Sequence, residues 1–107
     1  MLETFTALAD PNRFRIVEVL RDGPQPVNAL VEKLALSQPQ VSKHLAVLKR
    51  ADLVGVEPRA QQRVYRLNGA QWRALNAWTE QYRALWSERF DQIDAVIDEL
   101  KREDKPE

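Results

Sequence analysis

The side chains best suited to specific polar contacts lie close together in one short segment. Its polar residues are Ser37, Gln38, Gln40, Ser42, Lys43 and His44. Gln38 and Gln40 each offer an amide donor and a carbonyl acceptor, which can together bind an adenine edge bidentately. Lys43 offers an ammonium group for guanine O6 and N7 or for a phosphate, and Ser42 and His44 are short-range donors. This combination favours recognition of a nucleic acid.

Catalytic and metal-binding chemistry is not expected. The chain contains no cysteine and one histidine, so a histidine or cysteine ligand set and a cysteine nucleophile are excluded within one chain. A glycine-rich phosphate loop and the GxSxG and HExxH motifs are also missing. Four carboxylates at helical spacing are better explained as a solvated acidic face than as a metal site: Glu88, Asp91, Asp94 and Asp98. We therefore predict no enzyme activity, no metal and no cofactor.

Four helices are predicted in the first half of the chain. Apolar residues recur at the helical period within 2–9, 11–22, 27–36 and 38–51, and a loop at 23–26 separates the second from the third. Asp10 followed by Pro11 indicates a helix start, because aspartate caps free amides and proline fits the first turn. Ser37 with Gln40 three residues later forms a capping-box pattern, which indicates another start.

The last two of these helices predict a helix-turn-helix over residues 27–51, because only a few residues connect them. Val41, Leu45 and Leu48 fall on one side of helix 38–51, and we expect them to face the core. The opposite side is polar and basic. Simple solvation is the alternative explanation, because glutamine and lysine cover the exposed side of most helices.

Residues 53–67 change to an alternating apolar pattern, which predicts a β-hairpin, or wing, with its strands within 54–67. The polar turn 59–63 contains no Asn-Gly or Asp-Gly pair to specify a two-residue loop, so we expect a longer tip. Arg59 and Arg63 suit phosphates or a narrow minor groove, and Gln62 lies between them.

Residues 69–103 predict one long helix, or two helices broken near Ser87. About 34 helical residues span roughly 50 Å at 1.5 Å per residue, which is longer than one small domain is wide. We expect this helix and residues 1–9 to pair with a second copy of the chain. The residues expected at the dimer surface are Leu2, Phe5, Leu8, Trp78, Tyr82, Leu85, Trp86 and Ile93. The aromatic residues could instead enclose a small apolar effector.

Composition bounds the class of protein. The chain has 107 residues and a formal net charge of zero, which predicts one domain over 1–107. The charge is unevenly distributed, since residues 37–67 contain six bases and two acids, whereas residues 68–107 contain six bases and nine acids. A phosphate backbone would therefore meet a locally positive surface. No signal peptide or membrane span is recognisable, so we expect a cytoplasmic protein.

Three separated motifs resemble the ArsR-type family of winged helix-turn-helix repressors. ALADPNRFRIVEVL is similar to the family's opening helices, SQPQVSKHLAVLK to its recognition-helix stretch and RVYRL to its second wing strand. The resemblance covers residues 5–68. It implies a homodimer whose recognition helices enter successive major grooves of double-stranded DNA. Pro26 and Asn28 stand where many members have metal-binding cysteines, and Asp52 replaces the glycine before the wing.

We therefore predict a mainly α-helical winged helix-turn-helix protein that acts as a transcriptional repressor. Helix 38–51 and wing 54–67 are expected to bind an inverted-repeat operator. The alternative is a protein-interaction module that uses the long aromatic helix to bind a different protein. The basic segment favours DNA, because a scaffold has no need of it.

Overall fold

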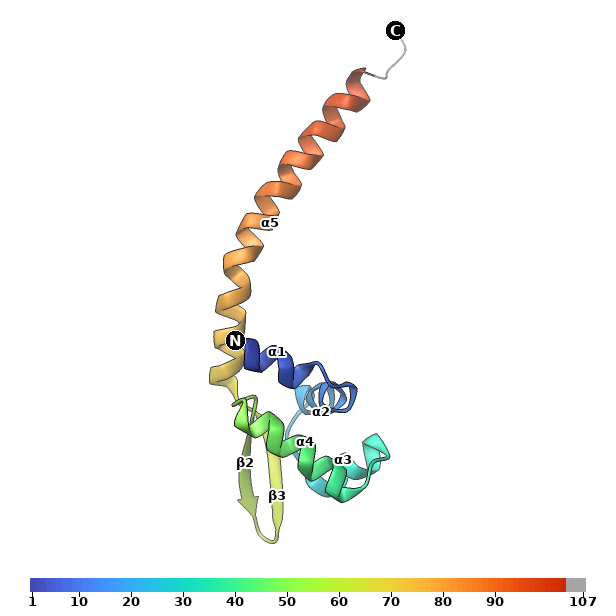
Figure 1. The fold of residues 1–107 in the computed structure, drawn as a ribbon, viewed down its shortest axis with the longest axis vertical. Coiled ribbons are helices and arrows are strands. Elements are labelled where there is room, and N and C mark those ends of the chain that lie inside the picture. Colours follow the sequence, from blue (N-terminus) through green and yellow to red (C-terminus); the bar gives the residue numbers. More distant parts are fainter. Residues whose placement is uncertain (104–107) are drawn as a thin grey trace. The chain divides into compact units, whose positions relative to one another are not determined.

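A computed structural model describes residues 1–103 of the chain (Figure 1). Its elements are α1 (Leu2–Leu8), α2 (Pro11–Arg21), β1 (Gln25–Pro26), α3 (Val27–Leu34), α4 (Gln38–Arg50), β2 (Val54–Arg59), β3 (Gln62–Leu67) and α5 (Gly69–Glu103). The mainly helical fold with a small antiparallel sheet confirms the predicted fold class. Residues 104–107 of the predicted single domain lie outside the described residues.

Local side-chain chemistry sets the starts of α2 and α4. The Asp10 carboxylate accepts hydrogen bonds from the backbone N–H groups of Asn12 and Arg13, at 2.8 and 3.1 Å. The helix itself leaves such first-turn amides unpaired. The Gln40 N–H donates to Ser37 Oγ at 3.3 Å, and the Ser37 N–H donates to Gln40 Oε1 at 3.0 Å. α4 therefore begins with the capping box that the sequence predicts.

The sheet contains one strand more than the sequence predicts. β1 pairs antiparallel with β3, with Gln25 opposite Tyr65 and Pro26 opposite Val64, so the strand order is β1-β3-β2. The prediction of a loop at 23–26 is wrong at these two residues, since a two-residue strand is too short to show an alternating pattern. Its edge position tolerates a proline, which has no N–H to donate.

The hairpin turn is tighter than predicted. Arg59 pairs directly with Gln62, so the loop contains only Ala60 and Gln61. The longer tip expected from the missing Asn-Gly or Asp-Gly pair is therefore wrong. Ala60 has a φ of 54°, a left-handed conformation that tight hairpin turns need and that glycine adopts more easily than alanine. Strand pairing next to the loop stabilises this conformation without a glycine.

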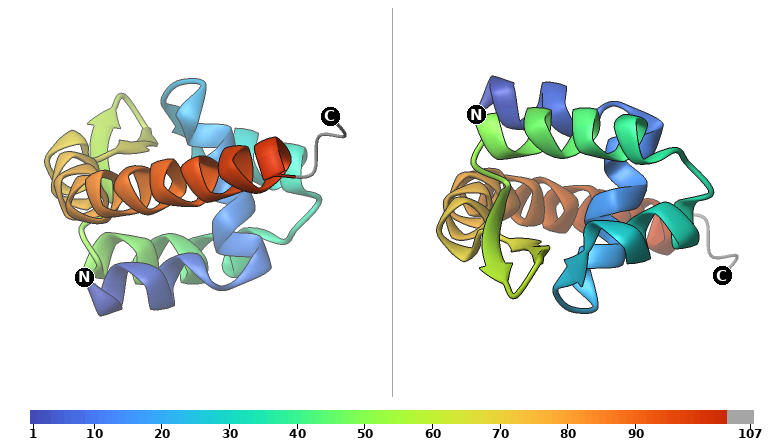
Figure 2. Two further views of the ribbon diagram at one scale, coloured as in Figure 1. Left: turned by 90° about the horizontal axis from the view of Figure 1, so that it is seen from above. Right: turned by 90° about the horizontal axis from the view of Figure 1, so that it is seen from below.

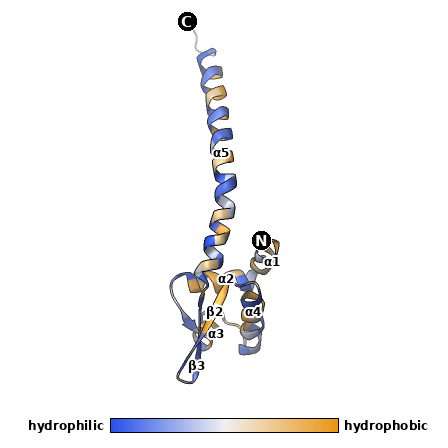
Figure 3. Ribbon diagram, turned by 90° about the vertical axis from the view of Figure 1, so that its left-hand side faces the viewer, coloured by the Kyte–Doolittle hydropathy of each residue, from blue (hydrophilic) through white to orange (hydrophobic). Residues whose placement is uncertain are grey.

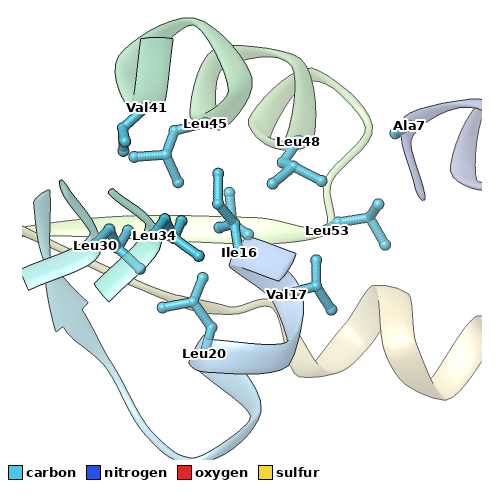
Figure 4. Packing of buried hydrophobic residues seen from close by; sticks show 11 residues of the cluster. Ala7, Ile16, Val17, Leu20, Leu30, Leu34, Val41, Leu45, Leu48 and Leu53 are labelled. Atoms are coloured by element: carbon cyan, nitrogen blue, oxygen red, sulfur yellow. The ribbon is translucent and has the colours of Figure 1, made fainter. Parts of the chain in front are cut away.

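One cluster of apolar side chains forms the core of the helix-turn-helix. It consists of Ala7, Ile16, Val17, Leu20, Leu30, Leu34, Val41, Leu45, Leu48, Leu53 and Val54. Val41, Leu45 and Leu48 of α4 are each 0% exposed, and they point toward the buried side chains of α2 and α3 (Figure 4). α1 lies alongside α4 (Figure 2). Burial of one branched side chain stabilises the fold by about 1.5–3 kcal/mol, so these three residues fix which side of α4 faces outward.

The first turn of α5 is tied to the start of the hairpin and to α1. The Leu53 carbonyl oxygen accepts hydrogen bonds from Asn68 N–H and Trp72 Nε1–H, each at 3.0 Å. Gln71 Nε2 donates to the buried Thr4 Oγ1, also at 3.0 Å. These contacts hold α1, the base of β2 and the beginning of α5 together.

α5 is one continuous helix of 35 residues, so a break near Ser87 is excluded. The chain divides into two compact units, Met1–Arg73 and the part from Ala74 onward. In the second unit, apolar residues recur along the helix among hydrophilic ones (Figure 3), and α5 contains no buried residue. None of the helices within residues 1–103 is both long and apolar enough to cross a membrane.

Candidate nucleic-acid interface

The outward side of α4 presents most of the polar residues singled out in the sequence. Ser37 at the N-cap, Gln38, Gln40, Ser42 and Lys43 are all exposed. At 100° per residue, Lys43 points away from the buried side of the helix, while Gln38 and Ser42 lie along one flank. α4 also has no acidic residue in its first turn. The exposed side therefore offers donors, acceptors and a cation without a competing carboxylate.

The Gln40 side chain accepts hydrogen bonds that cap the start of α4. Its Oε1 accepts hydrogen bonds from Ser37 N–H at 3.0 Å and Ser37 Oγ at 3.1 Å. A carbonyl oxygen has two lone pairs, so the capping box already uses both. A bidentate pair with adenine would need the same oxygen. Gln38 lies outside the capping box and keeps both amide groups for such a pair.

His44 lies apart from the exposed side, in the contact between α4 and the start of α2. Its side chain is 15% exposed, and its Nδ1 lies 3.9 Å from Asp10 Oδ1. This nitrogen is buried and forms no hydrogen bond within the described part of the chain. The pKa of the Asp10 carboxyl lies below its ordinary value of 3.8, chiefly because the Arg13 N–H donates a hydrogen bond to it. Burial partly opposes this shift. The Asn12 N–H and the charges of Arg13 and His44 lower the pKa further.

The hairpin supplies a second set of cations. Arg59, Gln62 and Arg63 are exposed at its tip. Glu57 Oε1 accepts a hydrogen bond from Arg66 Nε at 3.0 Å, and Glu57 Oε2 lies 3.6 Å from Arg59 Nη2. Among the described residues, Arg63 forms no salt bridge. The Glu57 carboxylate therefore pairs with Arg59 and Arg66. The Arg63 guanidinium has no carboxylate partner among the described residues and is available to bind an anionic ligand.

A groove of about 600 Å³ separates the flank of α4 from β3. Gln38 and Ser42 line it from α4, and Gln62 and Arg63 line it from β3. The structure therefore brings four of the predicted residues to one groove. Ser37, Gln40, Lys43, His44 and Arg59 do not line this groove.

Four further polar residues line the same groove and were not predicted as site residues: Asn28, Lys49, Gln61 and Tyr65. Gln61 belongs to the two-residue loop of the hairpin. Lys49 could have been found, because it continues the flank that begins with Gln38 and Ser42 at helical spacing. Asn28 and Tyr65 could not, because only the packing of α3 and β3 beside α4 brings them there.

The residues of α1 predicted for a dimer surface differ in exposure. Leu2 is 78% exposed and Phe5 is 40% exposed, whereas Leu8 is half-buried against the core. A leucine exposed this far gains apolar burial only if another surface covers it.

The predicted dimer residues of α5 lie in the second unit. Tyr82, Leu85, Trp86 and Ile93 are exposed, and Trp78 is half-buried. The Trp78 and Tyr82 rings lie 4.8 Å apart, and Trp86 stacks on Phe90 at 5.9 Å. Further exposed apolar residues extend this surface: Val96, Ile97 and Leu100.

Within residues 1–103, no three histidine, cysteine, aspartate or glutamate side chains gather in a way that could hold a metal ion. The carboxylates predicted to form a solvated face, Glu88, Asp91, Asp94 and Asp98, are all exposed.

One protein family and several known relatives match this chain. A helix-turn-helix domain family matches residues 8–57, which contain α2, α3 and α4. The chain is 39% identical over 92 residues to the HTH-type transcriptional regulator Rv2034 of Mycobacterium tuberculosis (strain ATCC 25618 / H37Rv), covering 86% of this chain and 83% of the relative. It is 32% identical over 68 residues to the transcriptional repressor SdpR of Bacillus subtilis (strain 168), covering 64% of this chain and 76% of the relative.

Solved structures share the fold. The crystal structure of an ArsR family transcriptional regulator, RHA00566, matches with a TM-score of 0.69 and 26% identity, covering 79% of this chain and 93% of that one. The solution structure of a homodimeric winged helix-turn-helix DNA-binding domain, Mb0332 from Mycobacterium bovis, matches with a TM-score of 0.65 and 25% identity. That match covers 74% of this chain and 73% of that one.

Proposed function

Because this chain belongs to the ArsR family of winged helix-turn-helix transcriptional regulators, we propose that it is a homodimeric repressor that binds an inverted-repeat DNA operator through α4 and the β2–β3 hairpin. The observation that supports this proposal most strongly is the exposed polar side of α4. Its rotation follows from three fully buried residues on the opposite side. A helix fixed in this way presents the same side chains to the major groove in every molecule.

Sequence recognition is assigned to the first two turns of α4. Gln38 binds an adenine edge through both amide groups, and Lys43 binds guanine O6 and N7 or a nearby phosphate. Ser42 donates to a base edge or to the backbone. Ser37 and Gln40 preserve the helix start that aims Gln38, because they form the capping box. His44 supports α4 through its contact with Asp10 and leaves recognition to its neighbours.

The hairpin is assigned to the DNA backbone and the flanking minor groove. Arg63 binds a phosphate directly, and Arg59 binds one after it leaves its salt bridge with Glu57. Gln62 lies between them in the sequence and donates a hydrogen bond from its side-chain amide. Such contacts are independent of sequence and weaken as salt rises, because each displaces condensed counterions from the DNA.

Dimerisation is assigned to α1 and α5. The homodimeric neighbour from M. bovis supports a dimer. The exposed apolar side chains support these two helices as its surface: Leu2, Tyr82, Leu85, Trp86 and Ile93. Two copies would place two recognition helices on half-sites about one helical turn apart. The proposal includes no catalytic step, metal, cofactor or effector. It takes the protein to act in the cytoplasm, as expected for a DNA-binding regulator like those of its bacterial relatives.

Selection of fragments from the host genome tests this function. Immobilised protein is incubated with sheared genomic DNA, and the bound fragments are sequenced. We expect enrichment of one inverted repeat, with an affinity at least about 10³-fold above that for random duplex. The variants Lys43→Gln and Lys33→Gln each remove one exposed lysine, from α4 and α3 respectively. Only Lys43→Gln should reduce the enrichment.

The exposed apolar surface of α5 also supports a second function, in which this helix binds a different protein. The same experiment separates the two functions. An absence of enriched sequence, together with duplex affinity that is unchanged in Lys43→Gln, would contradict the repressor proposal and favour the protein-interaction module.

A further inference from the structure

The groove between α4 and β3 has a chemical character that distinguishes it from a pocket for an apolar effector. Pockets for small molecules are lined mostly by hydrophobic and aromatic side chains. Here Lys49 and Arg63 are accompanied by amides and hydroxyls, and none of the described residues that line the groove has a carboxylate. The nearby Glu57 is engaged by Arg59 and Arg66. The groove therefore suits an anionic, hydrogen-bonding ligand.

The two cations reach the groove from different elements. Lys49 is exposed in the last turn of α4, and Arg63 is exposed near the start of β3. Gln38 and Ser42 lie on the same flank of α4 as Lys49. The groove thus begins beside residues proposed to contact bases and extends toward the hairpin. A ligand that follows it would be a chain of anionic groups, as in a sugar–phosphate backbone.

α3 and β3 add neutral polar side chains to the groove. Asn28 lines the groove from the first turn of α3, and its amide is a donor that tolerates any base sequence. Pro26 at the N-cap of α3 provides no side-chain hydrogen bond to the first-turn amides. Tyr65 of β3 lines the groove and packs partly against the core.

We propose that this groove holds one strand of the DNA backbone, with Lys49 and Arg63 binding its phosphates and Asn28 and Tyr65 positioning it. The inference rests on the proposed function and adds residues that the family match and the sequence motifs do not assign. The groove lies between the base-contacting end of α4 and the hairpin. A DNA strand seated there would set the positions of α4 and the hairpin along the duplex.

Salt dependence of binding to a short random duplex tests the proposal. Fluorescence anisotropy gives Kd for wild type, Lys49→Gln and the control Lys33→Gln at several salt concentrations. Both substitutions remove one charge from an exposed lysine of the same unit, but only Lys49 lines the groove. We expect Lys49→Gln to reduce the slope of log K against log salt by about 0.9 for each phosphate that the protein no longer neutralises. Lys33→Gln should leave the slope unchanged.

A second variant tests the groove without removing a cation. Ala46 lines the groove on α4, so Ala46→Glu introduces a carboxylate where the phosphates would lie. We expect it to weaken binding to every duplex at least tenfold, with an unchanged circular dichroism spectrum and melting temperature. Asn28→Ala should weaken binding to matched and random duplexes by the same factor.

The outcomes separate failure of the groove from failure of the function. If wild type binds duplex DNA with a steep salt dependence but Lys49→Gln and Ala46→Glu bind like Lys33→Gln, the groove proposal is wrong and the function stands. If wild type binds no duplex at any salt concentration, both are wrong. Inorganic phosphate at constant ionic strength is the final control. Saturable phosphate binding that requires Lys49, with an unchanged duplex slope, would indicate a free phosphate ligand and would overturn the proposal.

Discussion

α4 and the distal part of α5 are both amphipathic helices, but they use their apolar sides differently. In α4, Val41, Leu45 and Leu48 are 0% exposed. In α5 from Ala74 onward, the large apolar residues remain accessible, up to 57% exposure at Phe90. The same spacing therefore leads to burial within the chain in one helix and to an open surface in the other.

This difference indicates which apolar surface is already covered within a single chain. The apolar side of α4 is fully covered, so its polar side is held in place in one molecule. The apolar side of α5 has no cover among the described residues of its own unit. Because apolar burial contributes roughly 25 cal/mol per Å², a second copy that covers this surface would gain substantial free energy.

The largest expected effect is the loss of a core side chain in α4. Leu45→Ala should lower the free energy of unfolding by about 2–5 kcal/mol, because it removes buried methyl groups and leaves a cavity. Leu85→Ala, at an exposed position of α5, should change it by less than about 0.5 kcal/mol at protein concentrations where the chain is monomeric. Urea unfolding of both variants measures the difference. Equal losses would show that the two helices are buried alike.

The second effect concerns self-association. Ile93→Asp places a charge on the exposed apolar side of α5, and a charge buried without a partner at an interface is costly. We expect the dimer Kd to rise at least tenfold, which corresponds to about 1.4 kcal/mol. Gln92→Asp introduces the same residue at the neighbouring polar position and should leave the dimer intact. Sedimentation velocity over a concentration series distinguishes them, and an unaffected dimer in Ile93→Asp would exclude this side of α5 from the interface.

The third effect separates recognition from helix capping on α4. Gln38→Ala should reduce discrimination at one base pair of each half-site by about 1–3 kcal/mol. Gln40→Ala breaks the capping box and should lower stability by about 1 kcal/mol or less, with discrimination unchanged. Competition binding with single-base operator variants provides the measurement. If Gln40→Ala alters discrimination as much as Gln38→Ala does, Gln40 leaves the capping box when it binds DNA.

The smallest effect is the acid response of the α2 start. The pKa of Asp10 is lower in the folded chain than its ordinary 3.8, so its ionised form stabilises the fold. That stabilisation is fully present above pH 3.8 and is lost as the pH falls through the folded pKa. Asp10→Asn keeps an acceptor for the cap and should remove this part of the acid loss. Asp22→Asn, at the other end of α2, is the control. Melting temperatures at neutral pH and below pH 3.8 should differ less in Asp10→Asn than in wild type or the control.

Much of the fold was predictable because its signals are local. The capping box at Ser37 and Gln40, the proline after Asp10 and the alternation in 53–67 each depend on residues within a few positions. The same is true of the polar side of α4, since helical periodicity relates it to the buried side.

The missed features depend on residues far apart in the sequence. β1 exists because β3 lies beside Gln25 and Pro26. The tight hairpin loop holds Ala60 at a positive φ because strand pairing beside it specifies the register. His44 matches the sequence pattern of its neighbours, yet it lies against Asp10 because α2 packs beside it.

The sequence by itself determined the helices, the hairpin, the basic segment and the family, since periodicity, caps and charge are local properties of the chain. The tertiary structure decided which polar residues share a groove, because Asn28, Lys49 and Tyr65 come from α3, α4 and β3. It also decided that His44 lies against Asp10. The physical reason is that packing, which is non-local, sets the rotation and separation of the elements.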